Sequence, residues 1–343
     1  MRVTLRRHRL ELEVPFAIAR GTTSAQTICV AEVDHAGVTG LGEASPSAYY
    51  GDSAEAASEA IEGAGPILGD DPFAIHAVSQ RLLQRFPRSP SGRAAVEMAL
   101  WDVAGKLAGL PVFEMLGLAG LDLPRTSFTV GVDDVGLARR RVDRLSGFPI
   151  LKVKVGFGAE EDLLGLLRRE TTAVLRVDAN EGWQADQAIE KIRAWKEYGI
   201  EFFEQPLAKL DKDGYAKIKR HTDALVFVDE GVTTSADIAQ WVGLADGINI
   251  KIMKCGGLGE GLRMIAVARA LGLRVMLGCM VESSLGITAA AHLAPLADYC
   301  DLDGNLLISN DPFAGVTSAR GVLALPPGPG LGVTPRNPAD RHA

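Results

Sequence analysis

The sequence contains no long run of apolar residues. No stretch reaches the roughly 18 apolar residues that a membrane-spanning helix needs, and the arginine-bearing N-terminus has no apolar core of the kind that a secretory signal peptide needs. Lysine and arginine form no basic stripe, and the formal net charge is −7, so nucleic acid is not an expected partner. The sequence therefore predicts a cytoplasmic protein that binds neither a membrane nor nucleic acid.

Cysteine is also scarce. The chain has four cysteines, which form no CxxC pair and no metal-binding spacing, at positions Cys29, Cys255, Cys279 and Cys300. We expect reduced thiols in or near the core. A GxGxxG turn that opens a helix is missing too, which argues against an open dinucleotide-binding sheet. The 47% of hydrophobic residues are those of an ordinary globular protein.

What the sequence does have is a repeated pattern of short apolar runs. Eight of them recur about every 25 residues, centred near Thr129, Val153, Val177, Phe203, Phe227, Ile250, Val275 and Asp301. Segments with apolar residues at helical spacing lie between most of them, as in 183–199 and 261–272. Eight alternating strands and helices predict an α/β fold with a closed (β/α) barrel, and an open doubly wound sheet is the alternative.

The chain is longer than the roughly 250 residues of a plain barrel. Residues 1–115 contain alternating strand patterns with glycine turns, followed by helical stretches, and predict an α+β capping domain. We expect the barrel over 116–310. The segment 311–343 is rich in proline and glycine and is predicted to return over the first domain as a tail.

Three acidic residues stand at the ends of predicted barrel strands. Asp178, Glu204 and Asp229 each end or follow one of three adjacent predicted strands, and the carboxyl ends of barrel strands converge on one rim. Unneutralised carboxylates in one pocket would raise one another's pKa, and a divalent cation relieves that repulsion. Oxygen-only ligands suit Mg²⁺. The alternative interpretation is three separate salt bridges or helix caps.

Lysines complete the pattern. Lys152 and Lys154 are two apart on one predicted strand, so their side chains leave the same face, and each ammonium disfavours the charge of the other. We expect at least one of them to act as a base near neutral pH. Lys251 lies four strands further on and would face them across the metal site. The alternative is a solvated lysine pair.

These residues resemble a known family. The segments LKVKV, VDAN, EQP, VDE and INIKIMKCGG are similar to those of the enolase superfamily, and more narrowly of its muconate-lactonizing subgroup. The resemblance spans nearly the whole chain. It implies an enolase-type barrel in which Asp178, Glu204 and Asp229 hold Mg²⁺. It also implies that Lys154 and Lys251 are an opposed acid/base pair and that Lys152 tunes Lys154.

The resemblance also bears on the substrate. Asp301 and Asp303 are predicted on the last strand, where dipeptide epimerases of the subgroup carry a DxD motif for the substrate's α-ammonium. Arg20 would pair with an acidic substrate side chain, while Met280 and Thr129 would line the pocket. The alternatives are solvated aspartates, a surface arginine and a core methionine.

The sequence thus predicts an isomerase, a Mg²⁺-dependent dipeptide epimerase that prefers L-Ala-D/L-Glu and moves the α-proton of the C-terminal residue through an enediolate. The partner is a small dipeptide, and a homo-oligomer is allowed. Other enzymes of the subgroup remain open, namely o-succinylbenzoate synthase, N-acylamino acid racemase and muconate cycloisomerase. A non-catalytic metal-binding barrel is the third alternative.

Overall fold

The N-terminal third of the chain forms an antiparallel sheet backed by helices. The structure, a computed structural model, describes residues 1–343 apart from 19–20, 132–137, 139–144, 146, 157–159 and 337–343. The three strands pair in the order β1 (Arg2–Ile18), β2 (Gly21–His35) and β3 (Val38–Ala44), as the alternating pattern predicts. The helices are α1 (Ala54–Glu62), α2 (Gly65–Leu68), α3 (Ile75–Arg85), α4 (Pro90–Ala108) and α5 (Val112–Met115).

Helix α4 lies directly on this sheet because two glycines let the backbones approach. A Cβ at Gly42 would lie 1.9 Å from the carbonyl oxygen of Ala95, and one at Gly40 would lie 2.1 Å from that of Ala99. Larger side chains on β3 would push the helix away. Residues 91–100 and 102–105 of α4 are all buried, so the rest of the fold encloses this helix on nearly every side.

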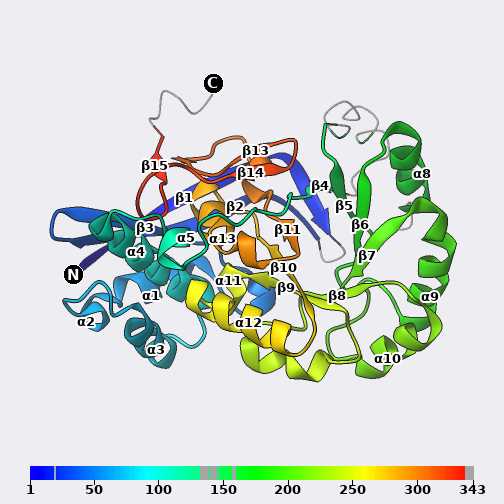
Figure 1. The fold of residues 1–343 in the computed structure, drawn as a ribbon, viewed down its shortest axis with the longest axis horizontal. Helices are drawn as coiled ribbons and strands as arrows, with labels where there is room; N and C mark the ends of the chain where they lie inside the picture. Colours follow the sequence, from blue (N-terminus) through cyan, green and yellow to red (C-terminus); the bar gives the residue numbers. More distant parts are fainter. Residues whose placement is uncertain (19–20, 132–137, 139–144, 146, 157–159, 337–343) are drawn as a thin grey trace.

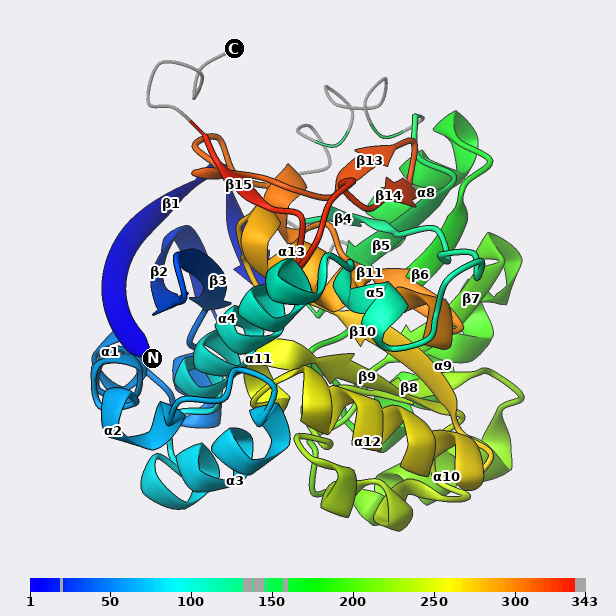
Figure 2. The ribbon, with the colours of Figure 1, turned by 60° about the vertical axis from the view of Figure 1, so that its left-hand side comes forward.

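The second part is an eight-stranded parallel barrel, as predicted (Figures 1 and 2). Its strands follow chain order: β4 (Phe128–Val130), β5 (Ile150–Lys154), β6 (Val174–Asp178), β7 (Ile200–Glu204), β8 (Val226–Val228), β9 (Gly247–Lys251), β10 (Arg274–Gly278) and β11 (Tyr299–Asp301). A bridge between Thr126 and Cys300 brings the first and last strands together, and Ser127 N donates to Cys300 O at 3.1 Å. The open-sheet alternative is therefore wrong.

Helices cover the outside of the barrel (Figure 1). They are α8 (Glu160–Glu170), α9 (Ala185–Ala194), α10 (Lys212–His221), the short α11 (Ile252–Cys255), α12 (Leu258–Ala270) and α13 (Ser284–Ala291). From β5 to β11, the described connections lack a long helix only between β8 and β9, which are joined by two 3₁₀ turns, η3 (Ser235–Asp237) and η4 (Ala239–Trp241). Asp237 accepts hydrogen bonds from Thr233 and Thr234, which favours a tight turn over a helix.

The C-terminal tail contains short strands rather than irregular chain alone. β12 (Phe313–Ala314) pairs with β15 (Thr334–Pro335), and β13 (Thr317–Ala319) pairs with β14 (Val322–Ala324). Leu331 N donates to Asp102 on α4 at 2.8 Å, so the tail contacts the N-terminal part. The same tail also touches the barrel, where Thr126 N donates to Gly321 O at 2.9 Å.

The four cysteines are free thiols, and three of them lie in the core. Cys29, Cys255 and Cys300 are buried, Cys279 is partly exposed, and none forms a disulfide. Among the described residues we find no helix with the length and apolar character needed to cross a bilayer.

Candidate active site

Five ionisable side chains stand at the carboxyl ends of five successive strands. Lys154, Asp178, Glu204 and Lys251 are the last residues of β5, β6, β7 and β9, and Asp229 directly follows β8. Each is less than a tenth exposed. Apolar residues precede them in the strands, and the carboxyl ends of all barrel strands lie at the same rim of the barrel. The structure therefore brings the predicted metal ligands and lysines together.

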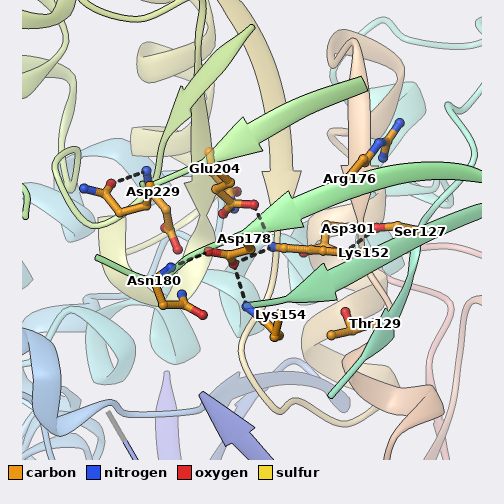
Figure 3. Close-up of polar contacts among 12 residues, drawn as sticks. Ser127, Thr129, Lys152, Lys154, Arg176, Asp178, Asn180, Glu204, Asp229 and Asp301 are labelled. Carbon is orange, nitrogen blue, oxygen red and sulfur yellow. Dashed lines mark hydrogen bonds and ion pairs between the residues drawn. The ribbon is translucent and has the colours of Figure 1, made fainter. Parts of the chain in front are cut away.

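Lys152 lies at the centre of this group (Figure 3). Its Nζ is 2.6 Å from Asp301 Oδ2, 2.8 Å from Glu204 Oε2 and 3.1 Å from Asp178 Oδ2. Burial by itself lowers the pKa of Lys152, but the three carboxylates outweigh it and raise that pKa well above the ordinary range. The expected lowering of pKa within the lysine pair therefore does not apply to Lys152.

Lys154 and Lys251 also pair with carboxylates. Lys154 Nζ donates to Asp178 Oδ2 at 2.6 Å, and Lys251 Nζ donates to Asp229 Oδ2 at 2.7 Å. β5 and β9 stand on the two sides of β6, β7 and β8 in the sheet order, so the three acidic strands separate these two lysines. Lys254, three residues past the end of β9, is also buried and donates to Asp229 Oδ1 at 2.6 Å.

Two amides hold the carboxylates in place, and the sequence interpretation missed both. Asn249 Nδ2 on β9 donates to Glu204 Oε1 at 2.8 Å. Gln205 Oε1 accepts from the backbone N–H of Asp229 at 2.8 Å, while Gln205 Nε2 donates to the hydroxyl of Tyr215. Their positions beside Glu204 and Lys251 in the EQP and INIK segments were the available signal.

The turns that carry these groups are strained. Asn180, Glu181 and Gln205 adopt positive φ angles of 43°, 68° and 39°. Asparagine tolerates this conformation, but glutamate and glutamine rarely adopt it. Backbone strain of this kind persists where surrounding contacts hold it, and it gathers at functional sites. Here Asn180 N donates to Asp178 Oδ1 at 3.0 Å, so the strained turn also fixes a predicted metal ligand.

The carboxylates have unequal pKa values. Burial and the charge of Asp178 raise the pKa of Glu204 to about 7. Burial also opposes ionisation of Asp178, but Lys154 and Lys152 outweigh it and lower that pKa to about 2. In this structure the carboxylates pair with lysines. Among the described residues, no group of three acidic, histidine or cysteine side chains stands close enough together to hold a metal ion as placed. The donor set, three buried carboxylates from adjacent strands, nevertheless fits a hard divalent cation.

Asp301 and Asp303 form the opposite wall. Asp301 ends β11 and accepts from Ser127 Oγ at 2.6 Å, while Asp303 lies two residues past the strand and accepts from the backbone N–H of Thr129 at 2.6 Å. Burial and the neighbouring Asp301 raise the pKa of Asp303 to about 7. Such a carboxyl gains from a cationic partner.

A cavity of about 640 Å³ joins these groups. Its lining includes Thr129, Met280, Asp301, Asp303 and the three lysines at positions 152, 154 and 251. Asp178 and Glu204 are not part of the lining but contact Lys152, which is. Arg20, the remaining predicted contact, lies outside the described residues. The roles of all these residues stay predictions, although the structure brings the described ones together.

The capping domain closes the same cavity. Tyr49 and Tyr50, in the 3₁₀ turn η1 (Ala48–Tyr50), line it together with Gln26. The hydroxyl of Tyr49 donates to Glu181 Oε2 at 2.7 Å, and Ser45 Oγ donates to Val281 O at 2.7 Å. Both bonds join the N-terminal part to the barrel rim.

A pair of buried glutamates lies at that junction. Glu282 accepts from the backbone N–H of Met280 at 2.7 Å, and burial raises its pKa to about 7. Glu43 on β3 accepts from the N–H and the hydroxyl of Ser283, and burial and Glu282 raise its pKa well above the ordinary value. No sequence pattern pointed to Glu43.

Comparisons with known proteins agree with this geometry. Residues 1–117 match the family described as mandelate racemase / muconate lactonizing enzyme, N-terminal domain, and residues 134–339 match the family described as enolase C-terminal domain-like. The chain is 38% identical to an L-Ala-D/L-Glu epimerase of Bacteroides thetaiotaomicron, over 97% of this chain and 88% of that one.

Solved structures are similar over the same length. A dipeptide epimerase from Enterococcus faecalis, complexed with Mg and the dipeptide L-Leu-L-Tyr, superposes with a TM-score of 0.91 at 32% identity, covering 97% of this chain and 98% of that one. A substrate-liganded L-Ala-D/L-Glu epimerase from Bacillus subtilis gives a TM-score of 0.90 at 33% identity, with the same coverage.

Proposed function

The chain belongs to the mandelate racemase / muconate lactonizing enzyme family of the enolase superfamily, and on that premise we propose that it is a Mg²⁺-dependent dipeptide epimerase. It is then an isomerase that inverts the α-carbon of the C-terminal residue of a dipeptide. The observation that carries the proposal is the position of Lys154 and Lys251, on strands that flank the three acidic strands.

The residues that would hold Mg²⁺ are Asp178, Glu204 and Asp229. All three are buried at adjacent strand ends, and burial together with the charge of Asp178 raises the pKa of Glu204 to about 7, an effect that a bound cation would oppose. When bound, the ion supplies Lewis acidity that increases the acidity of the C–H next to a substrate carboxylate. Asn249 and Gln205 would keep Glu204 and Asp229 oriented toward it.

The two lysines would move the proton. In one direction a neutral amine at Lys154 removes the α-proton from one face, and the ammonium of Lys251 returns a proton to the opposite face. The reverse direction exchanges the two roles. Lys152 cannot easily be a base, because three carboxylates stabilise its ammonium form. It would instead hold positive charge beside the developing negative charge of the substrate.

Asp301 and Asp303 support a dipeptide over an N-acyl amino acid. Both carboxylates line the cavity on the far side from Asp229, and only a substrate with a free α-ammonium would use them. The pKa of Asp303 is raised to about 7, and a substrate ammonium beside it would favour the ionised carboxylate and form an ion pair with it. A substrate without an ammonium would offer Asp303 no cation, whereas Asp301 already binds the ammonium of Lys152.

The preferred dipeptide is L-Ala-D/L-Glu in our proposal. It rests on Arg20 and on the similarity to two relatives with that name. The relative from Enterococcus faecalis holds L-Leu-L-Tyr at a similar identity, so the choice has to be tested by a panel. Among the described residues, the cavity contains no cation apart from the three lysines already engaged with carboxylates.

The test is α-proton exchange in D₂O. Purified protein with Mg²⁺ is given a dipeptide library, and mass spectrometry and ¹H NMR follow deuterium uptake and epimerisation. We expect uptake with L-Ala-L-Glu and none with N-acetyl-L-glutamate. Exchange of N-acyl amino acids alone would favour a racemase of the subgroup, and tight Mg²⁺ binding without any exchange would favour a non-catalytic barrel.

Lysine variants separate the two half-reactions. Lys154→Ala and Lys251→Ala are each expected to abolish epimerisation, while each still exchanges deuterium into one stereoisomer only. The isomer should differ between the two variants, because the two bases face opposite sides. The same isomer exchanging in both variants would place both lysines on one side and refute the proposal.

A further inference from the structure

A second cavity lies at the other end of the barrel. It encloses about 670 Å³, and four arginines line it: Arg125 before β4, Arg168 and Arg169 at the end of α8, and Arg320 between β13 and β14. We call it the arginine cavity. Pro149 and Ala173, which precede β5 and β6, form part of its wall. The five residues of β5 separate it from Lys154 by about 15 Å of strand.

The charge of the arginine cavity is opposite to that of the chain. Acidic residues outnumber basic ones in the sequence and the net charge is −7, yet the residues that line the cavity include four arginines and a single acidic residue, Glu170. None of the four arginines pairs with a described carboxylate. Other arginines of the chain do pair with one, namely Arg2, Arg6, Arg9, Arg176, Arg263 and Arg269.

Arg168 has hydrogen-bonding capacity that the protein does not use. One of its terminal nitrogens, Nη1, donates to Ala173 O at 2.9 Å, whereas its Nε is buried without a partner. A buried donor without an acceptor is costly, and few native groups of this kind remain unexplained by a ligand or water.

Arg320 is held in the cavity at a conformational cost. β13 and β14 are joined by the two residues Arg320 and Gly321, with φ angles of 51° and 78°. A two-residue turn with both φ angles positive favours asparagine followed by glycine, and arginine is disfavoured at the first position. The turn directs the Arg320 guanidinium to the cavity wall, where Nε donates to Gly147 O at 3.3 Å. The turn itself lies against the chain before β4 (Figure 2).

We propose that the arginine cavity binds a small polyanion that carries phosphate groups. The planar fork of a guanidinium matches phosphate oxygens in pairs, and four such groups around one hollow suit a ligand with several concentrated negative charges. Its volume is in the range of small-molecule sites. The site is independent of the proposed epimerase reaction and uses none of its residues.

The experiment measures pyrophosphate binding by isothermal titration calorimetry, with EDTA present and Mg²⁺ absent. We expect one site per chain, an affinity that falls as NaCl is raised, and weaker binding of citrate at the same ionic strength. No heat with 10 mM pyrophosphate would overturn the proposal. Tighter binding of citrate than of pyrophosphate would overturn the choice of phosphate.

Arg320→Asn is the sharpest variant, because asparagine suits the turn and the protein should fold at least as well as wild type. Pyrophosphate affinity should fall roughly tenfold, as expected for the loss of one charged hydrogen-bonding group, while dipeptide epimerisation is unchanged. Arg125→Gln should weaken binding similarly. Arg263→Gln, which removes a paired arginine on α12, is the matched control and should bind as wild type. Equal binding by wild type and both cavity variants, or equal loss in the control, would refute the site.

Discussion

Glu282→Gln is expected to stabilise the protein above neutral pH. The side chain is 2% exposed and accepts from Met280 N at 2.7 Å, a bond that the glutamine oxygen can keep. Burial raises the pKa of Glu282 from 4.5 to about 7, although the bond from Met280 and the charge of Lys251 oppose the rise. When the pKa of a carboxyl is higher in the folded state than in the unfolded state, protonation stabilises the folded state. The free energy of unfolding of the wild type therefore falls as pH rises from about 4.5 to about 7.

The size of the effect follows from that interval. Each pKa unit corresponds to about 1.4 kcal/mol, so ionising Glu282 costs about 3 kcal/mol at pH 8. Urea unfolding followed by circular dichroism between pH 4.5 and pH 9 measures it. The free energies of unfolding of wild type and Glu282→Gln should agree near pH 4.5 and diverge through pH 7, with the variant more stable.

The control is Glu190→Gln, an exposed substitution on α9, which tests the effect of exchanging a carboxyl for an amide. A wild type and Glu282→Gln variant that differ by a constant amount at every pH would refute the reasoning, because the carboxyl would then have the same pKa in both states.

Three further predictions concern stability and metal binding. Lys152→Met should lower the free energy of unfolding by about 3 to 5 kcal/mol in urea, because it leaves buried carboxylates without their shared ammonium; a loss below 1 kcal/mol would contradict this. Gln205→Ala should weaken Mg²⁺ binding in calorimetry about tenfold, because the N–H of Asp229 loses its acceptor, and unchanged affinity would exclude that role. Gly42→Ala should destabilise the protein by more than about 1 kcal/mol through its clash with α4, whereas Gly165→Ala within α8 should stabilise it by about 0.5 to 1 kcal/mol; thermal melts that rank the two in the opposite order would contradict the packing.

Much of the barrel was predictable because its signals are local. Each strand is a short apolar run, and Asp178, Glu204 and Lys251 end their runs within the same few letters of sequence. The helix missing between β8 and β9 was not predictable in this way, because the hydrogen bonds of Asp237 decide that turn.

Contacts between distant segments were beyond the sequence pattern. The two-residue spacing predicted that Lys152 and Lys154 leave the same face of one strand. The nearest partner of Lys152, however, is Asp301, which is 149 positions away and comes close only because the barrel closes. Glu43 reaches Ser283 from the other domain over 240 positions. Such contacts depend on how two folded parts meet, which no local periodicity records.

Joining β4 to β11 has a consequence for the order in which the chain is synthesised. The first barrel strand leaves the ribosome long before Cys300, the residue that pairs with Thr126. Until then the nascent barrel exposes two unpaired strand edges, which are prone to aggregate. Residues of the last barrel strand therefore complete the hydrogen bonding of a segment made more than a hundred positions earlier.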